Sequence, residues 1–175
     1  RVVFFCPFVY DVEREKKVIR QGEIKMKKEP FVTKEQIEEI VKSYPTPFHL
    51  YDEKGMRENM KALKEAFSWN KGFREYFAVK ATPNPFIIKK LKEAGCGVDC
   101  SSATELMIAD KLGFRNDEIM FSSNETPEGE FKYCNELGGI INLDDITMID
   151  YMEAECGIPE TVSCRYNPGG VFEVC

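Results

Sequence analysis

The chain has 175 residues, of which 43% are hydrophobic and 31% charged, and its 24 Lys and Arg against 30 Asp and Glu give a net charge of −6. This composition excludes disordered, collagen-like and coiled-coil proteins, and the length fits one domain or a piece of a larger one. An acidic chain without a basic run disfavours nucleic acid and anionic membranes as partners. No apolar stretch approaches the roughly 18 residues of a membrane span.

The seven cysteines form no C-x-x-C pair, and His49 is the only histidine. Zinc sites are built from closely spaced cysteine and histidine ligands, so the sequence predicts no metal site. The odd cysteine count favours reduced, partly buried thiols, which predicts a cytoplasmic protein.

The first 25 residues differ in character from the rest of the chain. An apolar patch and a charged run precede Met26, and the tripeptide QGE at 21–23 can be encoded by bases that contain a ribosome-binding sequence. We therefore interpret residues 1–25 as translated upstream DNA or a disordered extension, with an ordinary N-terminal extension as the alternative. At the other end, the NPGG segment at 167–170 indicates a turn, which suggests a strand or loop cut in mid-course.

Residues 26–52 are predicted to form a helix and a strand ahead of the main domain. The segment TKEQ at 33–36 matches a capping box and predicts a helix to about Ser43, ended by two prolines. Residues 48–51 then predict a short strand. Apolar side chains at helical spacing predict a second helix; they are Met56, Met60, Leu63 and Phe67.

From residue 73 onward, predicted strands and helices alternate with a steady period. The strands are expected at Phe73–Val79, Gly97–Cys100, Glu118–Phe121, Gly139–Leu143 and Thr161–Arg165, so their centres recur about every 21 or 22 residues. Such alternation implies a parallel sheet with right-handed crossovers, either an open doubly wound sheet or a (β/α)8 barrel. The open sheet usually carries a glycine-rich nucleotide motif after its first strand, and none is present. We therefore predict an α/β fold, five of the eight strand–helix units of a TIM-like barrel, over residues 53–175.

Polar residues follow the carboxyl end of each predicted strand. Because these ends share one rim of a barrel, the following side chains are expected to converge: Lys80, Asp99, Ser122, Asn124, Asp144 and Arg165. The alternative, which stays open for residues 122–124 and 144–145, is that polar residues simply mark the change from strand to loop.

Lys80 follows the apolar run at 76–79, so we expect it to be desolvated at the inner end of a buried strand. Desolvation lowers a lysine pKa and makes the neutral amine available to attack a carbonyl. Asp99 and Arg165 could orient the amine and balance its charge. The alternative is a surface lysine that caps the strand.

Four segments, in order, resemble motifs of the fold-type III pyridoxal-phosphate decarboxylases. The segment FAVKATPNP at 77–85 resembles the family's lysine motif, and TPFHLYD at 46–52 is similar to its opening. GVDCSSATEL at 97–106 is similar to the second-strand segment, and CRYNPG at 164–169 resembles the corresponding segment of diaminopimelate decarboxylases. The resemblance covers about residues 46–170.

This resemblance implies a pyridoxal 5'-phosphate cofactor that forms a Schiff base with Lys80, the catalytic residue. It also implies that Arg165 lies near the cofactor ring and that Asp99 and Glu105 line the cofactor pocket. Glu105 has a local alternative as the capping-box partner of Ser102.

By resemblance, the chain is the N-terminal part of an amino-acid decarboxylase, with meso-diaminopimelate as the expected substrate and L-lysine as the product. The family's ring-stacking histidine, its phosphate loop and its C-terminal β-domain would follow Cys175. We therefore expect residues 1–175 to be inactive alone. The full-length protein is expected to be a homodimer. The alternatives are an ornithine or arginine decarboxylase, an alanine-racemase-like enzyme, or a non-enzymatic cofactor-binding barrel or regulator.

Overall fold

The computed structural model describes residues 2–5 and 30–166. The chain divides into two compact units, one of residues 8–56 and one of residues 1–7 with 57–175. Residues 6–29 lie outside the described residues, and they include most of the segment interpreted as non-native. That interpretation stays a prediction.

The smaller unit contains the predicted capped helix, α2 (Lys34–Ser43). The Thr33 amide donates to Oε1 of Gln36 at 2.8 Å, and the Gln36 amide donates to Oγ1 of Thr33 at 3.2 Å, which confirms the capping box. The predicted strand at 48–51 was wrong, because this segment is irregular. A strand needs a hydrogen-bonded neighbour for its backbone groups, and none pairs with this segment in the described residues.

Helix α3 (Glu53–Ala66) begins in the smaller unit and continues into the larger one. The Asp52 side chain caps it by accepting a hydrogen bond from the Gly55 amide at 2.9 Å. Met60, one of the apolar residues at helical spacing, is buried. The predicted second helix is therefore confirmed.

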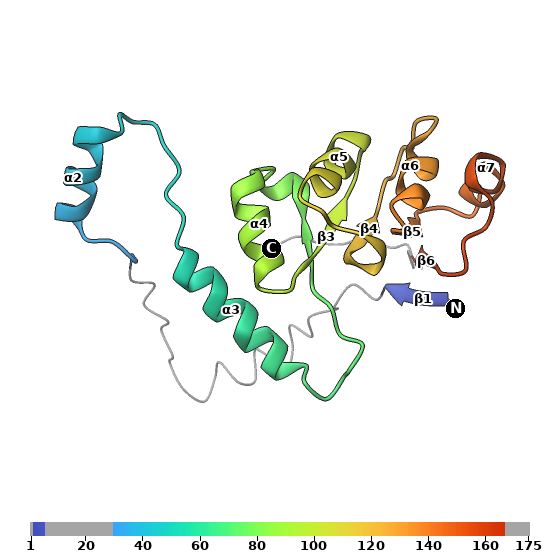
Figure 1. Cartoon of the computed structure of the whole chain (residues 1–175), viewed down its shortest axis with the longest axis horizontal. Helices are drawn as coiled ribbons and strands as arrows, with labels where there is room; N and C mark the ends of the chain where they lie inside the picture. The colour runs from blue at the N-terminus through green and yellow to red at the C-terminus, as the bar shows by residue number, and fades with distance from the viewer. Residues whose placement is uncertain (1, 6–29, 167–175) are drawn as a thin grey trace, which may run out of the picture. The chain divides into compact units, whose positions relative to one another are not determined.

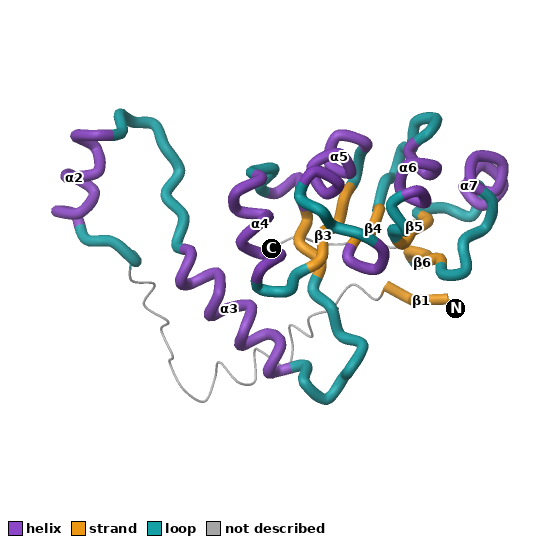
Figure 2. Tube along the Cα trace, in the orientation of Figure 1, coloured by secondary structure: helices purple, strands orange, loops and turns teal. Residues whose placement is uncertain are grey.

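The larger unit is built on a parallel sheet whose strands lie in the order β1-β6-β5-β4-β3-β2. The five predicted strands form β2 (Tyr76–Ala78), β3 (Gly97–Cys100), β4 (Ile119–Phe121), β5 (Ile140–Leu143) and β6 (Val162–Arg165). The strand β1 (Val2–Phe5), which was not predicted, pairs with β6 at the edge. This arrangement, visible in Figures 1 and 2, confirms the α/β fold and is consistent with a partial barrel.

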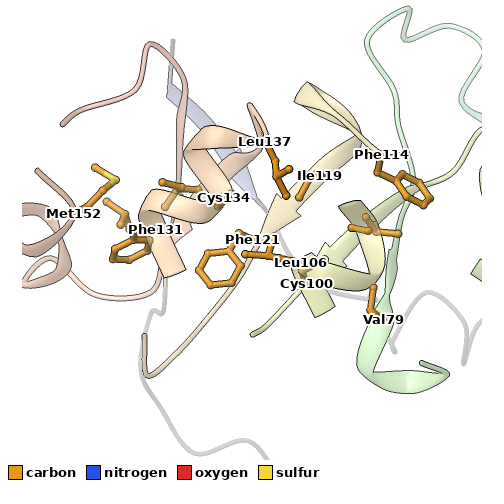
Figure 3. Packing of buried hydrophobic residues seen from close by; sticks show 14 of the residues in the cluster. Val79, Cys100, Leu106, Phe114, Ile119, Phe121, Phe131, Cys134, Leu137 and Met152 are labelled. Carbon is orange, nitrogen blue, oxygen red and sulfur yellow. The ribbon is translucent and has the colours of Figure 1, made fainter. Parts of the chain in front are cut away.

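The helices α4 (Pro85–Glu93), α5 (Ala103–Lys111), α6 (Glu130–Glu136) and α7 (Met148–Cys156) alternate with the strands, as expected from the apolar periodicity. Two 3-10 turns complete the unit, η1 (Val79–Ala81) and η2 (Asn116–Glu118). Apolar side chains of the helices and strands form one buried cluster, shown in Figure 3. At its centre, Phe121 meets Phe131 edge to face, with 6.1 Å between ring centroids.

The two faces of the sheet differ in chemistry because side chains alternate along a strand. Val98, Cys100 and Phe121 belong to the apolar cluster with the helices. Side chains at the alternate positions of each strand point to the opposite face, which carries Asp99, Asn142 and other polar groups. This polar face holds the candidate site.

The part of the chain that the structure describes contains no helix long and apolar enough to cross a bilayer. Five cysteines are free thiols there, and Cys96, Cys100 and Cys134 are buried. Burial raises the pKa of the Cys134 thiol to about 12. Within residues 2–5 and 30–166, no cluster of three or more potential ligands is placed to hold a metal ion.

Candidate functional site

Lys80 lies in the 3-10 turn η1, directly after β2. The strand is shorter than predicted, and Lys80 is exposed rather than desolvated. The expectation of a buried lysine was therefore wrong. Val79 is fully buried, but the turn that begins there carries the next side chain out of the apolar layer. The Lys80 amine is thus accessible to a ligand on the polar face.

Asp99, on the polar face of β3, is the acid of this site. Its atom Oδ1 is buried and has no hydrogen-bond partner. Burial raises the pKa of Asp99, while the nearby Ser122 hydroxyl and the positive charges of Lys80 and Arg165 act in the opposite direction. Lys80, Ser122 and Arg165 therefore lie near enough to Asp99 to influence its charge, which supports the predicted grouping.

Arg165, at the end of β6, is held by two polar side chains, one that follows β5 and one that follows β4. It forms an ion pair with Asp144, after β5, and its Nη2 donates to Oδ1 of Asn124 at 2.5 Å. Its Nε is buried without a partner. Three of the six polar residues predicted to converge, Arg165, Asp144 and Asn124, are therefore in contact. Arg165 keeps one donor unused.

A row of hydrogen bonds crosses the polar face and was not predicted as a whole. Oγ of Ser163 donates to Oδ1 of Asn142 at 2.8 Å, and Nδ2 of Asn142 donates to Oγ of Ser122 at 3.3 Å. Ser163 and Asn142 are almost fully buried and lie side by side in the register of β5 and β6. The sequence signal was a polar residue inside an otherwise apolar strand, as in IINL at 140–143.

Glu105, in the first turn of α5, has local contacts. Its Oε2 accepts from the Ser101 amide at 2.8 Å, and its own amide donates to Oγ of Ser102 at 3.4 Å. Only half of the predicted capping box forms, because the carboxylate bonds the amide of Ser101 rather than that of Ser102. The role of Glu105 in the cofactor pocket stays a prediction.

The site therefore offers an accessible primary amine, a buried carboxylate oxygen and a buried guanidinium N–H at one end of a parallel sheet. A cavity of about 270 Å³ lies beside it, at the carboxyl ends of β5 and β6, and Arg165 and Asp144 line it. A primary amine reacts with a carbonyl compound. The carboxylate binds hydrogen-bond donors and positive charge, whereas the guanidinium binds hydrogen-bond acceptors and negative charge.

Residues 53–171 match the sequence profile of the family described as pyridoxal-dependent decarboxylase, pyridoxal binding domain. The chain belongs to this family. The match spans both Lys80 and Arg165, and it includes the whole sheet except β1.

Named relatives agree with this assignment. The protein TabA of Pseudomonas amygdali pv. tabaci is 41% identical over 136 residues, which cover 78% of this chain and 31% of that protein. Diaminopimelate decarboxylase of Thermoplasma acidophilum is 30% identical over 133 residues, covering 76% of this chain and 32% of that protein. The chain thus spans about a third of the length of the relatives it matches.

Solved structures show the same fold. Lysine decarboxylase from Selenomonas ruminantium superposes with a TM-score of 0.67 at 22% identity, over 78% of this chain and 35% of that one. Diaminopimelate decarboxylase from M. jannaschi gives a TM-score of 0.63 at 27% identity, over 67% of this chain and 28% of that one.

The residues present fit pyridoxal 5'-phosphate, the cofactor of this family. Its aldehyde requires a primary amine, which Lys80 supplies at an exposed position. Its polar ring substituents require donors and acceptors, and the structure leaves the buried Arg165 Nε and Asp99 Oδ1 without partners of their own. Unused buried polar atoms are costly unless a ligand satisfies them.

The substitution Asp99→Asn is expected to stabilise the cofactor-free protein near neutral pH. Because burial raises the pKa of Asp99, its contribution to stability is complete below the unfolded pKa of about 4 and is lost as the pH rises through the folded pKa. An asparagine side chain carries no charge at any of these pH values, so the variant does not lose stability through ionisation at this position. Thermal unfolding followed across pH should therefore show the variant gaining on the wild type as the pH rises from about 4.

The matched control is Asp145→Asn, for which the sign is opposite. Hydrogen bonds from the amide and hydroxyl of Thr147 lower the pKa of Asp145. Its stabilising effect is therefore present above the unfolded pKa and lost as the pH falls through the folded one, so this variant should lose stability at neutral pH. Equal pH dependence of the wild type and Asp99→Asn would contradict the raised pKa of Asp99.

Proposed function

We propose that the protein containing this chain is a pyridoxal-phosphate-dependent amino-acid decarboxylase and that meso-diaminopimelate is its substrate. The observation that carries this proposal is the grouping of Lys80, Asp99 and Arg165 at the carboxyl ends of the strands, inside the matched pyridoxal-binding domain. In barrels this end carries the chemistry.

Each residue has a defined task in this proposal. Lys80 is the amine that would hold the cofactor aldehyde covalently, and its amino group would also serve in proton transfer. Asp99 and Arg165 bind and orient polar groups of the cofactor, and Asp144 and Asn124 hold the Arg165 side chain in place. When bound, pyridoxal 5'-phosphate supplies the conjugated ring that accepts the electron pair left by the departing carboxylate.

The choice of meso-diaminopimelate rests on relatives. Seven of the curated relatives, from archaea and bacteria, are named diaminopimelate decarboxylase and are 28–32% identical to this chain. The protein TabA, at 41% identity, carries no substrate in its name. The ornithine and arginine decarboxylases, together with a non-enzymatic cofactor-binding protein, stay as alternatives.

Two measurements on the full-length protein loaded with cofactor test the proposal. Borohydride reduction followed by peptide mapping should place the cofactor adduct on Lys80. Carbon dioxide release should then be faster with meso-diaminopimelate than with ornithine, arginine or lysine, by at least about tenfold in kcat/KM, a difference of about 1.4 kcal/mol. An adduct on another lysine would refute the site, and an adduct without carbon dioxide release would favour the non-enzymatic alternative.

Three further predictions concern the activity of the chain alone and the assembly and location of the full-length protein. We propose that the 175-residue chain alone does not decarboxylate, because it spans about a third of the length of its relatives. The homodimeric assembly and the cytoplasmic location stay predictions from the sequence.

A further inference from the structure

We propose that Glu130, on α6, is a positioning residue of the cofactor site, which holds the connection between β3 and α5 and thereby fixes the end of the strand that carries Asp99. The proposal rests on the proposed function and assigns a role to a side chain that belongs to none of the strands of the site. It starts from a hydrogen bond that crosses from α6 to the start of α5.

Two carboxylates hold the short connection between β3 and α5. Oε2 of Glu105 accepts from the Ser101 amide at 2.8 Å, and Oε1 of Glu130 accepts from the Ala103 amide at 2.7 Å. The first bond is local to α5, whereas the second ties the connection to the next helix. Amides at the start of a helix have no partner within the helix, so a carboxylate that accepts from one of them fixes the chain at that point.

The burial of Glu130 indicates that packing alone does not explain this residue. Glu130 is 8% exposed, and its Oε2 is buried with no hydrogen-bond partner among the described residues. Removing a carboxylate from water costs free energy that one hydrogen bond does not fully offset. An apolar side chain of similar length would fill the same space without that cost. The contribution specific to the carboxylate is its bond to Ala103.

The connection that Glu130 holds follows directly on the part of β3 that belongs to the site. Asp99 is the last but one residue of this strand, and the register pairs it with Ala78. Ala78 ends β2, and the turn η1 that follows carries Lys80. Because β3 has only four residues, a displacement of its carboxyl end is not absorbed within the strand and moves Asp99 relative to Lys80.

Cofactor binding to the full-length protein tests the proposal without depending on the reaction. The cofactor-free protein is titrated with pyridoxal 5'-phosphate, and binding is followed by absorbance. Glu130→Leu should raise the Kd by about tenfold or more, because a displaced binding group loses much of its effect. Glu130→Gln, which keeps an acceptor oxygen for the Ala103 amide, should stay within about twofold of the wild type.

A second variant removes the same bond from the donor side. Ala103→Pro has no amide hydrogen to donate, and proline is well accepted at the first position of a helix. Ser102, which precedes it, already has the extended backbone that a following proline requires. Ala103→Pro should therefore raise the Kd as Glu130→Leu does.

A double-mutant cycle separates positioning from a general structural role. If Glu130 acts through Asp99, Glu130→Leu should raise the Kd by less than about twofold once Asp99→Ala has removed the group that is positioned. The control is Asp52→Ala, which removes a carboxylate that accepts from the Gly55 amide at the start of α3. It should lower the urea midpoint and leave the Kd unchanged.

Two results would overturn the proposal. One is an unchanged Kd in Glu130→Leu and Ala103→Pro, and the other is an equal effect of Glu130→Leu with and without Asp99. Borohydride mapping of the wild type separates this proposal from the proposed function. An adduct away from Lys80 would refute the function itself, whereas an adduct on Lys80 with either of the two results would refute only the role of Glu130.

Discussion

Replacing Lys80 with alanine is expected to lower the decarboxylase activity of the full-length protein by at least about 10³-fold. The substitution removes the primary amine that binds the cofactor aldehyde, together with its role in proton transfer. Because Lys80 is exposed on η1, its replacement should leave the fold intact, so the loss reports on the amine itself. Steady-state kinetics with meso-diaminopimelate and the absorbance of the bound cofactor measure both losses.

Two matched variants separate the amine from the positive charge. Lys80→Arg keeps the charge beside Asp99 but has no reactive primary amine, so it should be as inactive as Lys80→Ala. Lys89→Ala removes an exposed lysine on α4 and should leave activity unchanged. Added methylamine should restore part of the activity of Lys80→Ala by supplying an amine. Substantial activity in Lys80→Arg would contradict the covalent role.

The substitution Phe121→Ala is expected to lower the free energy of unfolding by about 3–5 kcal/mol. Phe121 is fully buried in β4 and packs edge to face against Phe131 of α6. The loss combines the transfer of the ring from water with the cavity left between sheet and helix. Because a whole domain is stable by only about 5–15 kcal/mol, urea unfolding followed by circular dichroism should show a large shift of the midpoint.

Phe86→Ala is the control for the same chemical change at the surface. Phe86 is 62% exposed at the start of α4, so its removal should change stability by no more than about 0.5 kcal/mol. A loss below about 1 kcal/mol for Phe121→Ala would mean that the cluster in Figure 3 is not the core that holds the helices on the sheet.

The alternation of strands and helices could be predicted because it depends on short-range sequence patterns. The capping box at Thr33 and Gln36 formed as expected, and each of the five strands lies within its predicted position. The strand at 48–51 could not be predicted correctly, because its β-type residues signal only a preference and the hydrogen-bonded neighbour that a strand needs is a property of the fold. The edge strand β1 has the same explanation, since it exists through its pairing with β6.

Some features of the candidate site could likewise be predicted from the sequence and others could not. The polar residues after each strand were found from the sequence, because the carboxyl ends of parallel strands must share one edge. The exposure of Lys80 was predicted wrongly, since an apolar run before a lysine does not reveal the turn that carries its side chain outward. In the sequence, Asn142 and Ser163 are recognisable only as polar residues within apolar strands, and nothing local indicates that they contact each other.

The amino-acid sequence by itself therefore determined the order of the elements, their helix starts and the residues that end the strands, because caps and periodicity act over a few neighbouring residues. Only the tertiary structure decided which of these residues meet. The contacts of Arg165 with Asp144 and Asn124, and the row from Ser163 through Asn142 to Ser122, join strands that lie about twenty or more residues apart. Those contacts depend on the register and curvature of the sheet, which no local pattern encodes.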